Sequence, residues 1–393
     1  MTERELFFRH LGLPSANPSA LHITKAEGIY LYDNKGRQII DLCAGVSVSN
    51  IGHQHPAVIE AVKKQVEQYM HIHVYGELLQ SPQVKYAEFL TNQLPNQLDS
   101  VYFVNSGSEA NEGALKLAKR YTDRSEIISF KNAYHGSTHG ALSVLGDEYF
   151  KQAYRPLLPD IRFLEFNNEK QLEQITQKTA CVIVEPVQAE AGVIVPENNF
   201  LQKLRNRCDE TGTFLIFDEI QTGFGRTGEL FAFMKYNVVP DIMTIAKAMG
   251  GGMAIGAFVA SREIMDVLKT NPILGHITTF GGHPVSCAAA YANLKVILDE
   301  KLCDNVQKKG DLFLEKIRHS KIKSINGTGL LYAVELESAE MTSKFVEKAE
   351  KNGFITDAFL FAPQKFRIGP PLTIKDQQIQ IVSELILKTL DEI

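Results

Sequence analysis

The sequence predicts an α/β protein with a mainly parallel sheet that is covered by helices on both faces. Short apolar runs alternate with helical patterns across residues 49–282, which is typical of parallel βαβ winding. Two of these runs, 213–217 and 241–246, each end at one reactive residue, Asp218 and Lys247. Because ligands of such sheets bind outside the carboxyl ends of the strands, the same pattern predicts where a site lies.

The individual elements follow from local patterns. Near the amino terminus, the segments 28–32 and 38–42 flank the turn 33–36, which predicts a small hairpin. Strands of the main sheet are expected at 100–104, 126–130, 180–184, 213–217, 241–246 and 257–260.

The last part of the chain predicts a helix at 285–298, a strand at 329–335 and a final helix at 375–393. We expect both chain ends to share a smaller α+β domain. The predicted division is 1–48 for the first part of that domain, 49–283 for the large domain and 284–393 for the rest of the small one.

The composition narrows the class of protein. Of the 393 residues, 44% are hydrophobic and 22% are charged, as is ordinary for a soluble globular enzyme. The net charge of −5, without a basic stripe, argues against a nucleic-acid partner. Five scattered cysteines form no CxxC pair, and there is no signal-peptide pattern and no apolar run of about 18 residues. We therefore expect reduced thiols, a cytoplasmic location and no membrane span.

The acid and the lysine at the two strand ends predict a cofactor. Asp218 and Lys247 are expected on neighbouring elements at the carboxyl edge of the sheet. A lysine forms a Schiff base with pyridoxal 5'-phosphate, and a carboxylate holds the pyridine nitrogen of that cofactor protonated. We therefore expect a pyridoxal-phosphate enzyme with these two residues as catalytic groups.

The segment 105–112, Asn-Ser-Gly-Ser-Glu-Ala-Asn-Glu, follows a predicted strand and opens a helix that runs to about Tyr121. Ser106 and Glu109 match the capping box S-x-x-E. Alone, the segment is equally well an ordinary capped helix. Beside a Schiff-base lysine, its backbone N–H groups and hydroxyls favour a phosphate site.

Two further strand ends carry candidate residues. Tyr134 and His135 follow one of them, and the ring of Tyr134 is suited to stack on a flat heteroaromatic cofactor, although a lone tyrosine is more often part of a core. Glu185 ends the next predicted strand and Glu190 follows it, with a surface turn as the alternative for both. No histidine has the spacing to cysteine or acid partners that a zinc site requires, so we expect no metal.

Three loops leave alternatives open. Residues 223–228 match G-x-G-x-x-G, but a dinucleotide site requires its glycines directly between strand and helix, and 218–222 intervene. The loop 278–284, with two threonines and two glycines, is either a plain turn or a further phosphate contact. Arg367, before the rigid pair 370–371, either binds a substrate carboxylate bidentately or forms a structural salt bridge.

Taken together, these segments resemble the class III aminotransferases, a family that includes acetylornithine, ornithine and 4-aminobutyrate aminotransferases. The resemblance covers 28–371 and includes 41–46 (DLCAGV) and 52–56 (GHQHP). It is most specific at 218–228 (DEIQTGFGRTG), with Lys247 downstream. It implies fold type I of the pyridoxal-phosphate enzymes and a homodimer with its sites at the subunit interface.

The resemblance also implies roles for the matching residues. Lys247 carries the Schiff base, Asp218 pairs with the pyridine nitrogen and Gln221 lies near the ring hydroxyl. The expected cofactor-binding residues are Ser106, Gly107, Ser108, Tyr134, His135, Glu185, Asp218, Gln221, Lys247 and, from the other subunit, Thr279. Glu190 and Arg367 resemble a pair that swings between each other and substrate carboxylates.

The expected function is amino-group transfer from an amino acid or ω-amine, of the acetylornithine, ornithine or 4-aminobutyrate kind, to a 2-oxo acid such as 2-oxoglutarate in a ping-pong cycle. The freed amine of Lys247 would move a proton between the substrate and the cofactor. Alternatives with the same fold are an aminomutase, a racemase or a decarboxylase. A non-catalytic regulatory protein that binds the cofactor is an alternative of another class, and intact Lys247, Asp218 and Gln221 argue against it.

One position departs from the family pattern. Residues 134–138 are Tyr-His-Gly-Ser-Thr, whereas amino-acid-specific members usually have arginine at the place of Ser137. In the family that arginine grips a substrate carboxylate. Since serine cannot form a bidentate ion pair, the sequence does not define the amino donor.

Overall fold

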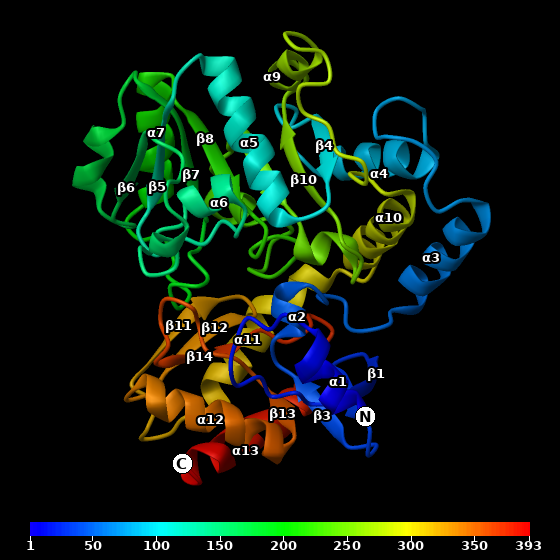
Figure 1. Ribbon diagram of the computed structural model, residues 1–393. Coiled ribbons are helices and arrows are strands. Elements are labelled where there is room, and N and C mark those ends of the chain that lie inside the picture. Colours follow the sequence, from blue (N-terminus) through cyan, green and yellow to red (C-terminus); the bar gives the residue numbers. More distant parts are fainter.

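A seven-stranded sheet forms the centre of the larger of two bodies in the computed structural model, which describes all 393 residues (Figure 1). In spatial order its strands are β4 (Ser100–Val104), β10 (Gly256–Ala260), β9 (Ile242–Ile245), β8 (Phe214–Asp218), β7 (Thr179–Val184), β5 (Glu126–Phe130) and β6 (Ile161–Leu164). The prediction of an α/β fold with a mainly parallel sheet is confirmed.

Strand β10 is the exception to the parallel arrangement, because it pairs antiparallel with both β4 and β9. The connection from Ile245 to Gly256 holds only the 3₁₀ turn η3 (Lys247–Gly250). A parallel crossover needs a dozen or more residues, usually with a helix, so this short connection returns the chain in the opposite direction. The pattern of apolar runs identified the strand but not its direction.

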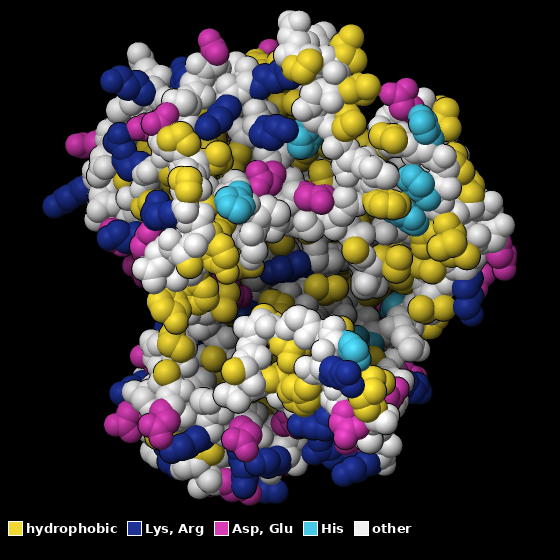
Figure 2. All heavy atoms as spheres, viewed as in Figure 1, with side chains coloured by type: hydrophobic (Ala, Val, Ile, Leu, Met, Phe, Trp, Pro, Cys, Tyr) yellow, Lys and Arg dark blue, Asp and Glu magenta, His cyan; other side chains and the backbone are white.

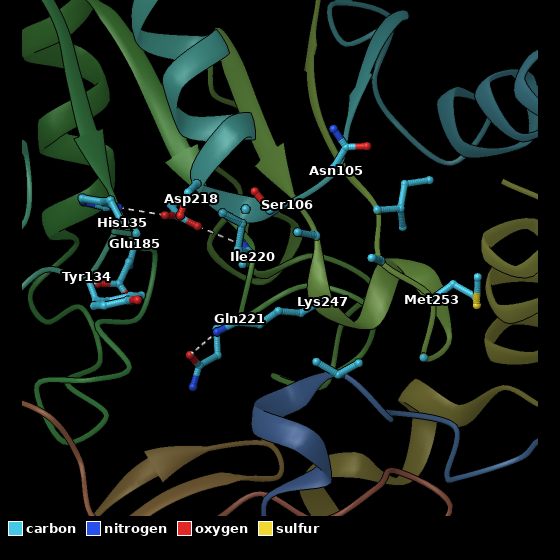
Figure 3. A pocket seen from close by; sticks show the side chains of 18 residues that line it. Asn105, Ser106, Tyr134, His135, Glu185, Asp218, Ile220, Gln221, Lys247 and Met253 are labelled. Carbon is cyan, nitrogen blue, oxygen red and sulfur yellow. Dashed lines mark hydrogen bonds and ion pairs between the residues drawn. The ribbon is translucent and has the colours of Figure 1, made fainter. Parts of the chain in front are cut away.

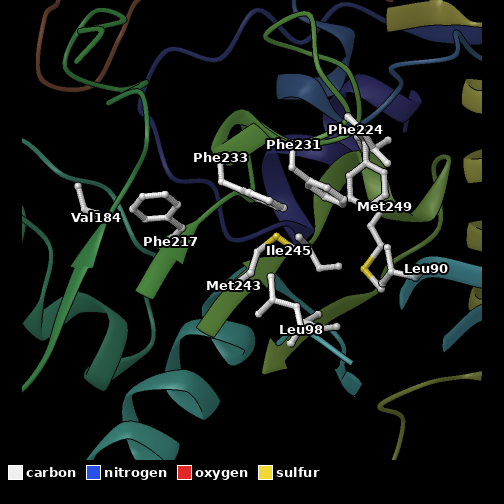
Figure 4. Close-up of a cluster of buried hydrophobic side chains, with 14 of the residues drawn as sticks. Leu90, Leu98, Val184, Phe217, Phe224, Phe231, Phe233, Met243, Ile245 and Met249 are labelled. Carbon is white, nitrogen blue, oxygen red and sulfur yellow. The ribbon is translucent and has the colours of Figure 1, made fainter. Parts of the chain in front are cut away.

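Helices cover both faces of this sheet. They are α3 (Pro56–Gln68), α4 (Ser81–Thr91), α5 (Gly107–Thr122), α6 (His139–Ser143), α7 (Phe200–Thr211), α8 (Ala232–Tyr236), α9 (Arg262–Asp266) and α10 (Pro284–Asp299). Phe217 and Met243 face a core that includes α3, α4, α7 and α10 (Figure 4), whereas Ile216 and Ile242 face a second core with α5. Because successive residues of a strand point to opposite faces, a strand buried on both faces must be apolar throughout, which explains the continuous runs in the sequence.

The smaller body contains both chain ends (Figure 1). One of its sheets has the order β1 (Ile23–Glu27), β2 (Tyr30–Asp33), β3 (Gln38–Asp41), β13 (Phe354–Ile355), and the other β11 (Ser324–Thr328), β12 (Leu331–Glu335), β14 (Lys365–Ile368). Its helices are α1 (Glu3–His10), α2 (Ala44–Ser47), α11 (Val306–Lys316), α12 (Ala339–Asn352) and α13 (Asp376–Asp391). Strand β13 pairs with β3, with Phe354 opposite Ile40. This pairing confirms that the two ends of the chain share one α+β unit.

The predicted domain boundaries, after residues 48 and 283, remain a prediction. Helix α10 packs against α3 and α4, and its residues Cys287 and Leu294 belong to the core of the larger body. The first helix of the predicted segment 284–393 therefore lies with the large sheet. None of the helices combines the length and the apolarity that crossing a membrane needs.

Candidate active site

A cavity of about 390 Å³ opens at the carboxyl edge of the large sheet. The space-filling view shows a hollow between the two bodies (Figure 2), and the close-up shows side chains that converge on the cavity from several strand ends (Figure 3). The segments that line it follow β4, β5, β7, β8 and β9. This is the position in which open α/β sheets bind ligands.

The structure brings most of the predicted cofactor-binding residues together. Those that line the cavity are Ser106, Gly107, Ser108, Tyr134, His135, Glu185, Asp218, Gln221 and Lys247. Thr279 is exposed and does not line the cavity of its own chain. Glu190 and Arg367 are both buried and paired with each other, outside the lining of the cavity.

Asp218 is buried and accepts three hydrogen bonds, of which Figure 3 shows those from His135 and Ile220. Its Oδ2 accepts from Nδ1 of His135 at 2.8 Å and from Nδ2 of Asn111 at 2.8 Å, and its Oδ1 accepts from the backbone N–H of Ile220 at 3.1 Å. Donors of this kind favour the ionised form of a carboxylate. The three donors therefore fix the orientation of this carboxylate at the end of β8.

Asn111 has a structural part in this arrangement that sequence reasoning did not assign. The hydroxyl of Thr244 donates to its Oδ1 at 2.7 Å, which fixes the orientation of the amide and directs its Nδ2 to Asp218. Asn111 is fully buried on α5 among residues such as Ala110 and Ala114. A polar residue on the apolar face of a helix was the signal that could have identified it, since buried amides need partners.

Lys247 lines the same cavity as Asp218 and lies directly after β9. Its Nζ donates to Oε1 of Gln221 at 2.8 Å. Burial lowers the pKa of Lys247 below its ordinary value, although the negative charge of Glu190 opposes this effect. A lysine with a lowered pKa has a larger fraction of neutral, nucleophilic amine.

The backbone at Lys247 is also unusual, because its φ of +48° lies in the left-handed region that residues with a side chain seldom adopt. Such a conformation persists only where the surrounding structure holds it, and it is frequent at functional sites. Here the buried strand β9 ends just before Lys247, and the turn η3 begins at Lys247, so these two elements hold the backbone in this conformation.

Two buried polar atoms of the lining have no hydrogen-bond partner. They are Nε2 of Gln221 and Nε2 of His135. Because unpaired buried polar groups are costly, these atoms indicate that the cavity is built for a polar ligand. Oε1 of Gln221 already holds Lys247, so its amide group is free to donate to a second acceptor beside the lysine.

The helix α5 begins at this cavity. Ser106 is its N-cap and accepts from the backbone N–H of Glu109 at 3.2 Å. Close approach explains two glycines here: a Cβ atom on Gly107 would lie 2.8 Å from Ile220, and one on Gly136 would lie 2.1 Å from Oγ of Ser108. A helix N-terminus with nearby hydroxyls and a bare backbone is suited to bind a phosphate.

Glu185 is enclosed at the end of β7. Its Oε1 accepts from the backbone N–H of Tyr134 at 3.0 Å and its Oε2 from that of Ala189 at 3.1 Å. Burial raises the pKa of Glu185 to about 7, although the charge of His135 opposes the shift. Glu185 therefore ties the loop that carries Tyr134 and His135 to the end of β7.

Arg367 is paired with a second carboxylate, Asp357, besides Glu190. Nη2 of Arg367 donates to Oε1 of Glu190 at 2.8 Å, and its Nε donates to Oδ1 of Asp357 at 2.7 Å. Burial opposes the charge of Arg367, but the two carboxylates outweigh it and hold its pKa above the ordinary value. Burial alone would raise the pKa of Glu190, but the charge of Arg367 holds it below its usual value. Asp357 was not identified from the sequence.

The loop 223–228 does not have the geometry of a dinucleotide site. It consists of turns, and no helix begins before Ala232. Its Arg226 is fully buried and donates to the carbonyl oxygens of Leu330 and Pro370. The loop therefore joins the larger body to the smaller one.

Comparisons with known proteins agree with this geometry. The family model for class III aminotransferases matches residues 13–390. The acetylornithine aminotransferase of Methanocaldococcus jannaschii is 39% identical over 94% of this chain and 92% of its own length. A transaminase from the marine bacterium Virgibacillus has a TM-score of 0.93 and 28% identity, covering 99% of this chain and 98% of its own. An ornithine aminotransferase of Toxoplasma gondii, described with partial occupancy of PLP at its active site, has a TM-score of 0.91 and 31% identity, covering 99% of this chain and 94% of its own.

Proposed function

Since this chain belongs to the class III aminotransferases and is therefore an enzyme of amino-group transfer, we propose that it works with pyridoxal 5'-phosphate bound to Lys247 in the cavity at the carboxyl edge of the sheet. The observation that carries the proposal is the meeting of Lys247, Gln221 and the triply hydrogen-bonded Asp218 in one cavity. The named relatives are aminotransferases, so the mutase, racemase, decarboxylase and regulatory alternatives are set aside.

The residues that line the cavity fit the parts of this cofactor. The amino-terminal end of α5, with Ser106, Gly107 and Ser108, would hold the phosphate. The carboxylate of Asp218 would pair with the pyridine nitrogen, and the unpaired Nε2 of Gln221 would donate to the ring hydroxyl. These three contacts would hold the cofactor in the cavity that Lys247 also lines.

When bound, pyridoxal phosphate accepts the electron pair that remains on the substrate carbon after a proton leaves it. The chain supplies the groups that move the proton. Because its pKa is lowered, the amine of Lys247 is available as a general base at the substrate carbon and then as the acid that returns the proton. Asp218 keeps its orientation, because three donors hold its two oxygens.

We propose an ω-amine of the acetylornithine or ornithine kind as the amino donor and a 2-oxo acid, such as 2-oxoglutarate, as the acceptor. The amino group moves from donor to acceptor, so that the donor leaves as a carbonyl compound and the acceptor as an amino acid. Arg367 is the candidate for the acceptor's carboxylate, because it is buried and cationic. Ser137 follows the lining residue Gly136 and is exposed, and its Oγ lies 3.3 Å from Oη of Tyr134. No arginine occupies that position, so it offers no ion pair to the carboxylate of the donor.

A homodimer would complete the site. Thr279 lies in the segment 273–280, which has several exposed apolar side chains. This segment contacts the segment 66–84, because the ring of Phe280 lies 5.1 Å from that of His71. The exposed large apolar residues of the two segments are Val66, Met70, Ile72, Leu78, Leu79, Val84, Ile273, Leu274, Ile277 and Phe280. A surface of this kind marks an interaction site, and a second copy placed on it would bring Thr279 to a neighbouring cavity. A cytoplasmic location remains a prediction that the five unpaired cysteines support.

The experiment that tests the proposed function is a spectroscopic half-reaction. The protein loaded with the cofactor is mixed with acetylornithine, ornithine, 4-aminobutyrate, lysine or β-alanine, one at a time. We expect the absorption band of the lysine-bound cofactor to disappear with the true donor and to return when 2-oxoglutarate is added. A band that no amine removes would contradict the proposed donors, and a protein that forms no band would contradict the cofactor assignment.

Lys247→Ala is expected to abolish the band and to reduce turnover by a factor of at least about 10³, because both the attachment point and the general base are lost. Lys151→Met is a matched control. Lys151 is also buried and its pKa is also lowered by burial, but its Nζ donates to the carbonyl oxygen of Leu145 outside the cavity. A Lys247→Ala protein that still transaminates would contradict the assignment.

A further inference from the structure

The guanidinium group of Arg367 is enclosed by carboxylates from two parts of the chain. Asp357 accepts from its Nε at 2.7 Å and Glu190 accepts from its Nη2 at 2.8 Å. The ring of Phe359 lies 4.3 Å from the guanidinium carbon and covers one face. Nη1 is buried and has no hydrogen-bond partner. The Nε donor is therefore committed to Asp357, while the Nη1–Nη2 end of the group retains unused donors.

The two carboxylates are attached to the molecule in different ways. Asp357 belongs to the same small body as Arg367, and the backbone N–H of Arg367 donates to the carbonyl oxygen of Asp357 at 3.0 Å. The hydroxyl of Thr356 also donates to the carbonyl oxygen of Arg367, at 2.6 Å. Asp357 is therefore fixed to the strand that carries the arginine, and it keeps its place whenever Arg367 keeps its own.

Glu190 comes from the larger body, in the segment that follows β7. Besides Arg367, it contacts the small body through its Oε2, which accepts from the backbone N–H of Leu360 at 3.2 Å. Its side chain is 7% exposed, against 38% for Asp357. Glu190 thus forms its contacts across the junction of the two bodies, and a change at that junction alters Glu190 before it alters Asp357.

Charge balance decides which carboxylate gives way to a substrate. Arg367 contributes one positive charge, and Glu190 and Asp357 contribute two negative charges. A third carboxylate would leave an excess of two negative charges around a guanidinium group that is itself buried, which is unfavourable. Glu190 must therefore leave Nη2 when a substrate carboxylate arrives, whereas Asp357 is bound at Nε and leaves the Nη1–Nη2 end of the guanidinium to that carboxylate.

We propose that Asp357 is a positioning residue for substrate carboxylates. Its hydrogen bond to Nε keeps the guanidinium turned toward the substrate while Glu190 gives way, so that Nη1 and Nη2 form the bidentate contact. The proposal rests on the proposed function of Arg367 as the carboxylate anchor. Without Asp357 the guanidinium group is free to rotate and to follow Glu190, and the contact with the substrate weakens.

The test compares two replacements in the full-length protein loaded with the cofactor. Asp357→Ala removes the acceptor of the Nε hydrogen bond, and we expect it to raise the KM for 2-oxoglutarate about tenfold with little change in kcat. Asp357→Asn keeps an oxygen in place of Oδ1 and removes one negative charge, so the KM is expected to stay at or below that of the unaltered protein. The half-reaction with a diamine, which involves no carboxylate and no 2-oxo acid, is expected to have the same rate in all three proteins.

Thr356→Val is the matched control, because it removes the hydrogen bond from the neighbouring side chain to the carbonyl oxygen of Arg367 without touching the guanidinium. We expect it to lower the melting temperature and to leave the KM unchanged. The proposal is overturned if Asp357→Ala leaves the KM at or below the original value, if both Asp357 variants raise it, or if the diamine reaction falls equally. An unaltered protein that does not react with 2-oxoglutarate would instead overturn the proposed function.

Discussion

Arg226 and Arg367 are both fully buried near the junction of the two bodies, but their donors are satisfied by different kinds of group. Arg226 donates to the carbonyl oxygens of Leu330 at 2.9 Å and Pro370 at 2.6 Å and to Oδ1 of Asn50. None of its partners carries a charge, and burial lowers its pKa to about 9. Arg367 has two carboxylates, and its pKa is held above the ordinary value.

The difference between their partners shows how a buried arginine can have two roles. Arg226 joins the two bodies, whereas Arg367 is proposed to bind a ligand. Carbonyl and amide oxygens are parts of the fold, so the contacts of Arg226 last as long as the two bodies stay together. A carboxylate is a chemical equivalent of the substrate group that Arg367 is proposed to bind, so Glu190 can be exchanged for it. A buried arginine that is paired with a carboxylate, such as Arg367, can exchange that carboxylate for one of a substrate. A buried arginine that is held by carbonyl and amide oxygens, such as Arg226, keeps its partners as long as the fold lasts.

The largest effect on stability is expected at Arg226. Arg226→Met keeps much of the packing but leaves the acceptors on Leu330, Pro370 and Asn50 unsatisfied, and we expect the free energy of unfolding to fall by about 3 kcal/mol. Relief of the buried charge offsets only part of this loss. Denaturant unfolding measures the change. An unchanged midpoint would mean that Arg226 does not join the bodies.

Arg367→Lys is expected to affect catalysis rather than the fold. A lysine keeps the positive charge between Glu190 and Asp357 but cannot form the planar bidentate contact. We expect kcat/KM for 2-oxoglutarate to fall about 100-fold, which corresponds to about 2.7 kcal/mol, with a much smaller change in unfolding free energy than in Arg226→Met. The opposite result, a loss of stability without a loss in kcat/KM, would break the distinction between the two arginines.

Glu219 is a buried carboxyl group that, like Arg226, has only uncharged hydrogen-bond partners. It is fully buried, its Oε1 accepts from the backbone N–H of Phe233 at 2.7 Å, and its Oε2 accepts from the hydroxyl of Thr222. Burial raises its pKa from 4.5 to about 7. The folded state therefore holds a proton that the unfolded state releases between about pH 4.5 and pH 7, so this group makes stability fall as the pH rises through that window.

Glu219→Gln removes that titration while keeping an acceptor for Phe233 and a donor for Thr222. We expect the variant to match the original protein near pH 5 and to exceed its unfolding free energy by about 2 kcal/mol near pH 8. Unfolding curves at the two pH values provide the test. Equal pH dependence in the two proteins would show that Glu219 is ionised in the folded state without penalty.

The sequence predicted those parts of the site that local patterns encode. Asp218 and Lys247 end buried strands, and the carboxyl ends of such strands meet at one edge of a sheet, so their proximity follows from the sequence alone. Asn111 and Asp357 could not be found in this way. Their contacts depend on how α5 and the small body pack on distant strands, and no spacing in the sequence encodes that packing.

The same limit applies to the fold. The apolar runs located β8 and β9 to within one or two residues, whereas the reversed direction of β10 and the short edge strand β6 depend on connection length and on position at the edge of the sheet. The exposed position of Thr279 shows the remaining limit. Its proposed role depends on a second copy of the chain, which neither local patterns nor the packing of one chain contains.

Lys247 is proposed to carry the cofactor, and chemical fixation tests this attachment most directly. The protein loaded with pyridoxal 5'-phosphate is reduced with borohydride, which makes the bond between lysine and cofactor permanent, and is then digested and mapped by mass spectrometry. We predict a phosphopyridoxyl group on Lys247, at the end of β9. A label on another lysine instead, or a reduced protein without a label, would contradict the account.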